Sequence, residues 1–170
     1  CLGKNYLDHA KEMQQKNADS IPEKPVLFLK PPSSLTACKI KNRNEISLPK
    51  NVGHRGEVHA ECEIVFRIQS RKISDVTLGL DITLRDMQTE LKKRGHPWEV
   101  SKVFPQSAVI GPWIPVSQFS DFLSHEFSFL INGRVQQKAR GEEMRLLPEE
   151  CIQYAGEYFD LCDGDLFFTG

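Results

Sequence analysis

Long apolar runs are missing from this sequence. It has no stretch of about 18 apolar residues, the length that a membrane-spanning helix needs, and no block of like charge that would favour a nucleic-acid or membrane surface. The formal net charge is −1, from 22 basic and 23 acidic residues. We therefore expect neither nucleic acid nor membrane as a partner, and a small molecule as the ligand.

Closely spaced cysteines are missing as well. The five cysteines are odd in number, scattered and never arranged as C-x-x-C, which argues against a disulfide framework and against a zinc knuckle. A reducing compartment fits this pattern, and we expect a cytoplasmic protein, or a mitochondrial one if the source is a eukaryote. Because the chain opens at Cys1 and not at a methionine, targeting is not readable from it.

The chain has 170 residues, of which 39% are hydrophobic, enough for one globular domain with a core. We expect a single domain over residues 1–170, mainly β with a few short helices (α+β). The sequence ends at Thr169-Gly170, where a strand would enter a loop, so we interpret the domain as incomplete at its C-terminus.

Two segments carry the clearest patterns. Residues Val58 to Ile68 alternate between the two faces of a strand, and Leu78 to Leu84 predict a second strand. A short polar helix follows from Arg85 to Arg94, ended by Gly95. The other expected elements are a helix from Asp8 to about Lys16, a buried strand at Pro25–Lys30 with a loop reaching Asn44, a strand at Val109-Ile110, a strand at Phe127–Ile131 with an Asn132-Gly133 hairpin turn, a helix near Pro148–Tyr158 and a strand at Asp165–Thr169.

Three carboxylates stand out within these strands. Glu61 and Glu63 are two residues apart, so both leave the same face, separated by about 7 Å. Asp81 lies inside the apolar strand Leu78 to Leu84, where an ionised side chain needs a partner. A hard divalent cation would satisfy all three, and all-oxygen ligands favour Mg²⁺, with Mn²⁺ or Ca²⁺ as alternatives. The competing interpretation is that both glutamates line a solvated face of an antiparallel sheet.

His9 and Glu12 are three residues apart in the first expected helix. The carboxylate could orient the imidazole as a general base. The alternative is a surface helix in which Glu12 pairs with Lys16 at the i,i+4 spacing. Lys102 and Gln88 have no distinguishing pattern and, from the residues alone, are ordinary solvated side chains.

Taken together, several motifs in order resemble the catalytic domain of the fumarylacetoacetate hydrolase family. They are Gly3 to Met13 followed by Pro25 to Pro31, His59-Ala60-Glu61-Cys62-Glu63, Gly79 to Gln88, Gly95 to Trp98 with Ser101 to Phe104, Asn132-Gly133, and Gly164 to Gly170. The resemblance covers essentially the whole chain. It implies a mixed β-roll, usually a homodimer, with Mg²⁺ held by residues that here match Glu61, Glu63 and Asp81.

The same resemblance implies roles for individual side chains. His9 and Glu12 match a base dyad that activates water, and Lys102 matches a residue that meets the carboxylate or the developing enolate of the substrate. The further substrate-binding positions are Gln88, Arg85 and Thr169. The sequence departs from relatives at Ala60, where a second histidine is common, and is shorter between Asp75 and Val76.

Three kinds of function remain open at this point. The first is a Mg²⁺-dependent hydrolase that cleaves the C–C bond of acylpyruvates (β-diketo acids) to give pyruvate and a carboxylic acid. The second uses the same enolate chemistry for oxaloacetate decarboxylation, or for isomerisation of a dienoate dioate from aromatic catabolism. The third is a catalytically silent binding or scaffold protein, which would not need Mg²⁺.

Overall fold

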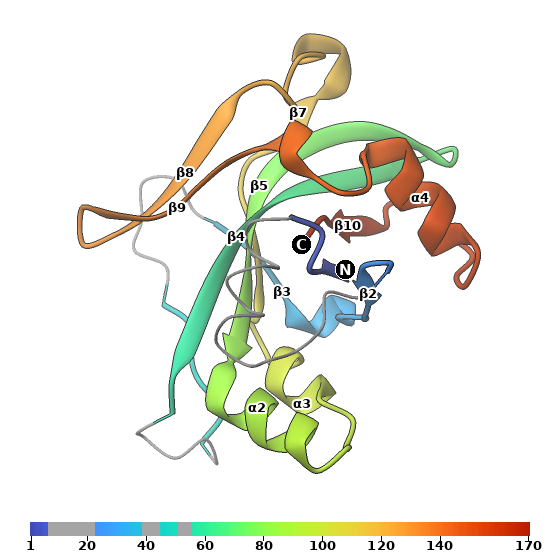
Figure 1. Ribbon diagram of the computed structural model, residues 1–170. Coiled ribbons are helices and arrows are strands. Elements are labelled where there is room, and N and C mark those ends of the chain that lie inside the picture. The colour runs from blue at the N-terminus through green and yellow to red at the C-terminus, as the bar shows by residue number, and fades with distance from the viewer. Residues whose placement is uncertain (7–22, 39–44, 51–55) are drawn as a thin grey trace. The chain divides into compact units, whose positions relative to one another are not determined.

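Strands dominate the part of the chain that the computed structural model describes, residues 1–6, 23–38, 45–50 and 56–170 (Figure 1). The strands are β1 Leu2–Gly3, β2 Val26–Leu27, β3 Leu35–Ala37, β4 Val58–Gln69, β5 Lys72–Leu84, β6 Ala108–Ile110, β7 Ile114–Pro115, β8 Glu126–Ile131, β9 Arg134–Arg140 and β10 Leu166–Phe168. The helices are α2 Arg85–Lys93, α3 Glu99–Lys102 and α4 Pro148–Gly156, with 3₁₀ turns η1 Pro32–Ser34, η2 Val116–Gln118 and η3 Gly141–Glu143. The mainly β fold class is confirmed, and the helix expected from Asp8 to Lys16 lies outside the described residues.

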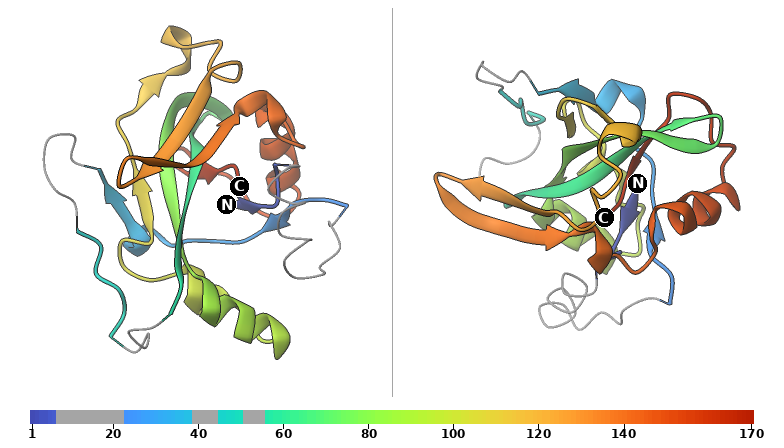
Figure 2. Two further views of the ribbon diagram at one scale, coloured as in Figure 1. Left: turned by 60° about the vertical axis from the view of Figure 1, so that its left-hand side comes forward. Right: turned by 90° about the horizontal axis from the view of Figure 1, so that it is seen from above.

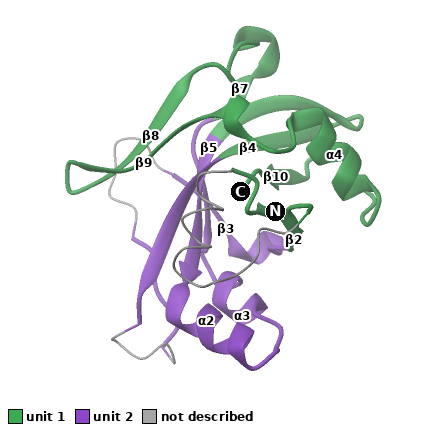
Figure 3. Cartoon of the chain, viewed as in Figure 1, with its two compact units in different colours: residues 1–28, 64–77, 113–170 green, residues 29–63, 78–112 purple. Residues whose placement is uncertain are grey.

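The chain divides into two compact units, each built from separate stretches of sequence (Figure 3). Unit 1 comprises residues 1–28, 64–77 and 113–170, and unit 2 comprises residues 29–63 and 78–112. Strands β4 and β5 each contribute residues to both units. The single domain expected from the sequence stays a prediction.

Unit 1 holds the larger apolar core. In this unit β10 pairs antiparallel with β4, Phe167 opposite Phe66, and β7 pairs with β5. The buried members of the core are Leu2, Tyr6, Ile64, Phe66, Val76, Phe122, Met144, Cys151, Ala155 and Phe167. The two chain ends lie side by side in this unit, as both views in Figure 2 show. Strand β1 runs so close to Gly170 that a Cβ added to this glycine would lie 3.2 Å from the carbonyl oxygen of Leu2.

The hairpin of β8 and β9 also belongs to unit 1. Asn132 and Gly133 form its turn with φ angles of 52° and 76°, the left-handed conformation that a two-residue type I′ turn requires at both positions. Phe127 and Ala139 face each other across the pair and pack against the core. The hairpin turn predicted at Asn132-Gly133 is confirmed.

In unit 2 the strands follow the order β4, β5, β6 and β3, so that β6 lies between β3 and β5. Strand β3 runs parallel to β6, and β6 runs antiparallel to β5, with Ala108 opposite Asp81. Helices α2 and α3 follow β5 and lie next to each other (Figure 1). Ile82, Leu84 and Phe104 form the buried apolar cluster of this unit.

Three expectations about the elements were wrong in extent. Strand β5 begins at Lys72 and not at Leu78, because it pairs with its neighbour β4 and, at Asp75 and Val76, also with β7. The segment expected as a loop up to Asn44 contains β3, which forms through its pairing with β6 far along the chain. The strand expected to be buried over Pro25–Lys30 is reduced to β2, which pairs with β1 for two residues only, and Val26 in it is exposed.

Candidate metal centre

The three carboxylates singled out in the sequence meet in unit 2. Glu61 and Glu63 extend from β4 and Asp81 from β5, and one ligand atom from each lies within 4.8 Å of the others. Glu63 is 2% exposed and Asp81 1% exposed. We call these three residues the carboxylate cluster. Among the described residues it is the group of acidic side chains that satisfies the spacing of a metal site.

The carboxylate cluster suits a hard divalent cation. Its donors are all oxygens, which Mg²⁺ and Mn²⁺ prefer, and buried carboxylates are costly without positive charge nearby. Oδ1 of Asp81 is buried and accepts no well-formed hydrogen bond from the described residues, although Lys30 lies close to it. Each carboxylate has two oxygens, so a cation and a lysine can share the cluster.

Lys102 lies against two members of the carboxylate cluster. It ends helix α3, its Nζ donates to Oε2 of Glu61 at 2.9 Å, and it also contacts Oδ2 of Asp81. Burial by itself lowers the pKa of this lysine, but the neighbouring carboxylates of Asp81 and Glu61 outweigh burial and raise the pKa of Lys102 above its ordinary value. The side chain is therefore an ammonium group at the centre of the site.

Arg85 extends the site from the start of helix α2. Its guanidinium contacts Glu61 through Nη2, donates from Nη1 to Oε1 of Gln88 at 2.8 Å, and donates from Nε to Nδ1 of His59 at 3.1 Å. Gln88 is buried and its carbonyl oxygen accepts from Arg85. The amide NH₂ of Gln88 is thus the end of that side chain that can donate to an anionic ligand.

Lys30 is a member of this site that sequence reasoning missed. Its Nζ lies 2.9 Å from Oδ1 of Asp81, and its side chain is 3% exposed. Burial lowers the pKa of Lys30, and the carboxylate of Asp81 acts in the opposite direction. A lysine placed before Pro31-Pro32 has the pattern of a solvated loop residue, so the one signal in the sequence was that it closes an apolar run.

The remaining predicted site residues are Thr169, His9 and Glu12. Thr169 belongs to unit 1, where it is fully buried and its hydroxyl donates to the carbonyl of Ile64 at 2.9 Å. His9 and Glu12 lie outside the described residues. The predicted roles of these three residues stay predictions.

No helix in the described part of the chain is long and apolar enough to cross a membrane.

Comparison with known proteins gives matches over the whole chain. The family model described as the C-terminal domain of fumarylacetoacetate (FAA) hydrolase matches residues 1–170. A protein of Escherichia coli named oxaloacetate tautomerase is 33% identical over 184 residues, which cover 100% of this chain and 78% of the relative. The mitochondrial oxaloacetate tautomerase of Rattus norvegicus is 31% identical to this chain over 179 residues, which cover 100% of this chain and 77% of the relative.

Solved structures agree with these matches. A fumarylacetoacetate hydrolase family protein from Yersinia pestis superposes with a TM-score of 0.86 at 33% identity, covering 100% of this chain and 78% of that one. The fumarylpyruvate hydrolase of Pseudomonas aeruginosa, solved in complex with Mn²⁺ and pyruvate, gives a TM-score of 0.86 at 30% identity, covering 100% and 75%.

Proposed function

Since the chain belongs to the fumarylacetoacetate hydrolase family, we propose that it is a divalent-metal-dependent enzyme acting on a small 2-oxo acid. The observation that carries the proposal is the meeting of Glu61, Glu63 and Asp81 with the ammonium of Lys102 in a buried site. Mg²⁺ or Mn²⁺ would be held by the three carboxylates. The Pseudomonas relative, solved with Mn²⁺ and pyruvate, supports both the type of metal and the type of ligand.

The charges of the site support a doubly negative substrate. The carboxylate cluster has three negative side chains, and three cationic side chains contact it, those of Lys30, Arg85 and Lys102. These six formal charges cancel, so a divalent cation would leave an excess of two positive charges. A dicarboxylate with a 2-oxo group, such as oxaloacetate or fumarylpyruvate, matches that excess.

The side chains of the site can divide the work of forming an enolate. A bound divalent cation would polarise the 2-oxo group and stabilise negative charge on its oxygen. Lys102 supplies an ammonium that can donate to the substrate carboxylate or to the enolate oxygen. Arg85 holds Glu61 and Gln88 in place, and the amide of Gln88 can donate to a second oxygen of the ligand.

Cleavage of an acylpyruvate is the first reaction we propose from this site. It requires attack by water on the carbonyl distal to the 2-oxo acid, and loss of the enolate of pyruvate as the C–C bond breaks. His9 with Glu12 is the base that we propose for the water. The fumarylpyruvate hydrolase among the similar structures supports this reaction.

Turnover of oxaloacetate is the second candidate. It needs no attack by water: decarboxylation would release CO₂ and leave the enolate of pyruvate, whereas tautomerisation would move a proton between C3 and the 2-oxo oxygen of oxaloacetate itself. The names of the Escherichia coli and Rattus norvegicus relatives favour it. Decarboxylation, which removes no proton from carbon, is the reaction to expect if the base at His9 is dispensable, whereas tautomerisation needs a base.

One assay separates the candidates. The protein is incubated with Mg²⁺ and with acetylpyruvate, fumarylpyruvate or oxaloacetate, and released pyruvate is coupled to lactate dehydrogenase, while the enol form of oxaloacetate is followed by its ultraviolet absorbance. Glu61→Gln removes one charge of the carboxylate cluster, and Glu142→Gln on the exposed turn η3 is the matched control. Turnover that needs both Mg²⁺ and Glu61 supports the proposal. A protein that binds no divalent cation and turns over none of the panel would be a scaffold.

We also propose a homodimer, because closed two-fold assemblies are the commonest and the family resemblance points the same way. Light scattering that gives the monomer mass would contradict this.

A further inference from the structure

Lys30 is a buried cation to which the proposed reaction assigns no step. Its Nζ lies 2.9 Å from the carbonyl oxygen of Ser107, 3.0 Å from the hydroxyl of Ser107 and 3.4 Å from the carbonyl oxygen of Ile82. It also contacts the carbonyl oxygen of Lys102 and lies 2.9 Å from Oδ1 of Asp81. An ammonium group has three N–H donors, so these acceptors saturate it. Lys30 therefore has no donor to spare for a substrate.

The acceptors of Lys30 come from three segments of unit 2. Asp81 and Ile82 belong to β5, Lys102 ends α3, and Ser107 precedes β6. The hydroxyl of Ser107 donates in turn to the carbonyl of Lys102 at 2.9 Å. The backbone at Lys102 is thus held by two donors, one from Lys30 and one from Ser107.

Lys30 and Lys102 contact different oxygens of the Asp81 carboxylate. Lys30 lies by Oδ1, whereas Lys102 contacts Oδ2. This arrangement restricts rotation of the carboxylate, because turning it would break both ion pairs in a buried place.

From these contacts we propose that Lys30 is a positioning residue of the metal centre. It fixes the carboxylate of Asp81 and the backbone of Lys102 relative to each other, so that the metal ligand and the ammonium face the same substrate. The role rests on the proposed function, since it concerns the same site.

Removal of Lys30 should change cation binding differently if the lysine only balances charge than if it positions the metal ligand Asp81. Removing a positive charge beside Asp81 would, by electrostatics alone, make the carboxylate cluster bind a cation more tightly. Removing a positioning contact weakens metal binding, typically by about 10-fold to 100-fold for partners that orient metal ligands. The two effects have opposite signs, so one titration distinguishes them.

The test is Mn²⁺ binding by the full chain, followed by electron paramagnetic resonance of the unbound ion, for Lys30→Met and for Lys93→Met. Lys93 is exposed at the end of α2 and serves as the matched control. Positioning predicts that Lys30→Met raises the Mn²⁺ dissociation constant about 10-fold, with a lowered kcat, while Lys93→Met leaves both unchanged. Binding by Lys30→Met that equals or exceeds that of the wild type would overturn the proposal.

A less disruptive substitution, Ser107→Ala, tests the proposal if Lys30→Met does not fold. Ser107→Ala keeps the lysine but removes the hydroxyl that contacts both Lys30 and the carbonyl of Lys102. We expect Mn²⁺ binding to weaken by about 3-fold, less than for loss of the lysine, because the other contacts of Lys30 remain. The kcat should fall at assay temperatures well below the melting temperature of the metal-free variant, so that lost stability does not account for the fall. Unchanged Mn²⁺ binding and unchanged kcat would contradict the proposal.

The wild-type protein separates this proposal from the proposed function. A wild type that binds no Mn²⁺ contradicts the metal-dependent function itself. A wild type that binds Mn²⁺ no more tightly than a folded Lys30→Met variant contradicts the positioning role alone.

Discussion

The ammonium nitrogen of Lys102 lies 2.9 Å from Oε2 of Glu61, and both side chains are largely withdrawn from solvent, with exposures of 7% and 18%. The residues are 41 positions apart in sequence, so the pair depends on the folding of unit 2 as a whole. The proposed catalytic cation and a proposed metal ligand are direct neighbours in this arrangement. Changes at either residue should therefore be visible both in metal binding and in turnover.

Replacing Lys102 by methionine should separate these two readouts. Lys102→Met removes the ammonium that would donate to the substrate, and we expect kcat to fall about 100-fold or more, as for the loss of a donor to developing negative charge. Mn²⁺ binding should be kept or tightened, because a cation that shares Glu61 and Asp81 is gone. Steady-state kinetics and a Mn²⁺ titration measure both effects. A variant with unaltered kcat would remove Lys102 from the catalytic set.

Replacing Arg85 by lysine should weaken the site although the charge is kept. The guanidinium reaches Glu61, Gln88 and His59 at once, whereas a lysine ammonium cannot reproduce that fork. We expect Arg85→Lys to lower kcat/KM about 10-fold. Arg94→Lys is the control, because Arg94 pairs with Glu90 on the exposed surface of α2. Equal effects of the two variants would show that the fork at Arg85 is unimportant.

The buried thiols should be unreactive in the folded protein. All five cysteines are described, and all are thiols. Burial raises the pKa of Cys151 to about 12, and the hydrogen bond from Asn5 opposes this only in part. At pH 8 a thiol reagent should modify the exposed Cys38 and Cys162, and reach Cys151 only after addition of denaturant. Rapid modification of Cys151 without denaturant would contradict the burial.

The same thiol makes stability depend on alkaline pH. In the unfolded chain Cys151 has its ordinary pKa of 9.0, below the folded value of about 12. Between these values the unfolded state releases the proton and the folded state keeps it, so the free energy of unfolding decreases as the pH rises from about 9 towards 12. Urea unfolding at pH 8 and pH 10 measures the decrease, and Cys151→Ala should reduce the difference between the two pH values.

Two glycines of unit 1 offer a matched test of packing. A Cβ at Gly141 would lie 2.6 Å from Cδ2 of Leu123 and 3.0 Å from Cδ1 of Ile64, whereas a Cβ at Gly156 meets nothing within 4 Å. Gly141→Ala should therefore destabilise the protein by about 1–3 kcal/mol through overpacking. Gly156→Ala, at the end of α4, should be neutral or stabilise by up to about 1 kcal/mol. Thermal or urea unfolding measures both, and equal effects would contradict the close contact at Gly141.

The sequence predicted the parts of the fold that local pattern determines. The alternation over Val58 to Ile68 corresponds to β4, the polar segment after Leu84 corresponds to α2, and Asn132-Gly133 forms the expected turn. The short strand β3 was missed because it forms through pairing with β6, which is a tertiary contact. A pattern of three residues is too short to predict such a contact.

The carboxylate cluster was predictable because its members are acidic residues in otherwise apolar strands. Lys30 was not, since its importance comes from contacts with Asp81, Lys102 and Ser107, the last two of which lie 72 and 77 positions further along the chain. Periodicity carries no information about contacts at that separation. The place of His9 and Glu12 in the site stays a prediction that rests on the family resemblance.

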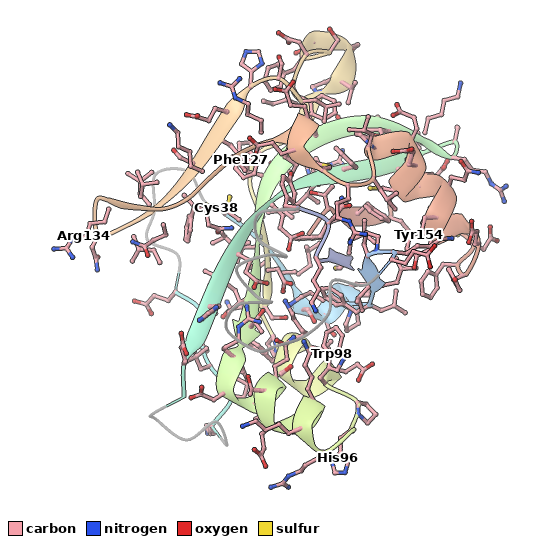
Figure 4. The ribbon with its side chains drawn as sticks, viewed as in Figure 1. Cys38, His96, Trp98, Phe127, Arg134 and Tyr154 are labelled. Carbon is pink, nitrogen blue, oxygen red and sulfur yellow. The ribbon has the colours of Figure 1, made fainter. Side chains whose placement is uncertain are left out.

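The hairpin of β8 and β9 offers a point of attachment for experiments on this protein. Its turn is exposed, a Cβ at Gly133 meets nothing within 4 Å, and Arg134 lies at the tip (Figure 4). Because exposed tips of this kind are where insertions are best tolerated, a peptide tag or a ligation sequence that replaces the tight turn at Asn132-Gly133 by a longer loop should leave the protein folded. The protein could then be tethered to a surface or labelled with a fluorophore through a segment that supplies none of the side chains of the carboxylate cluster.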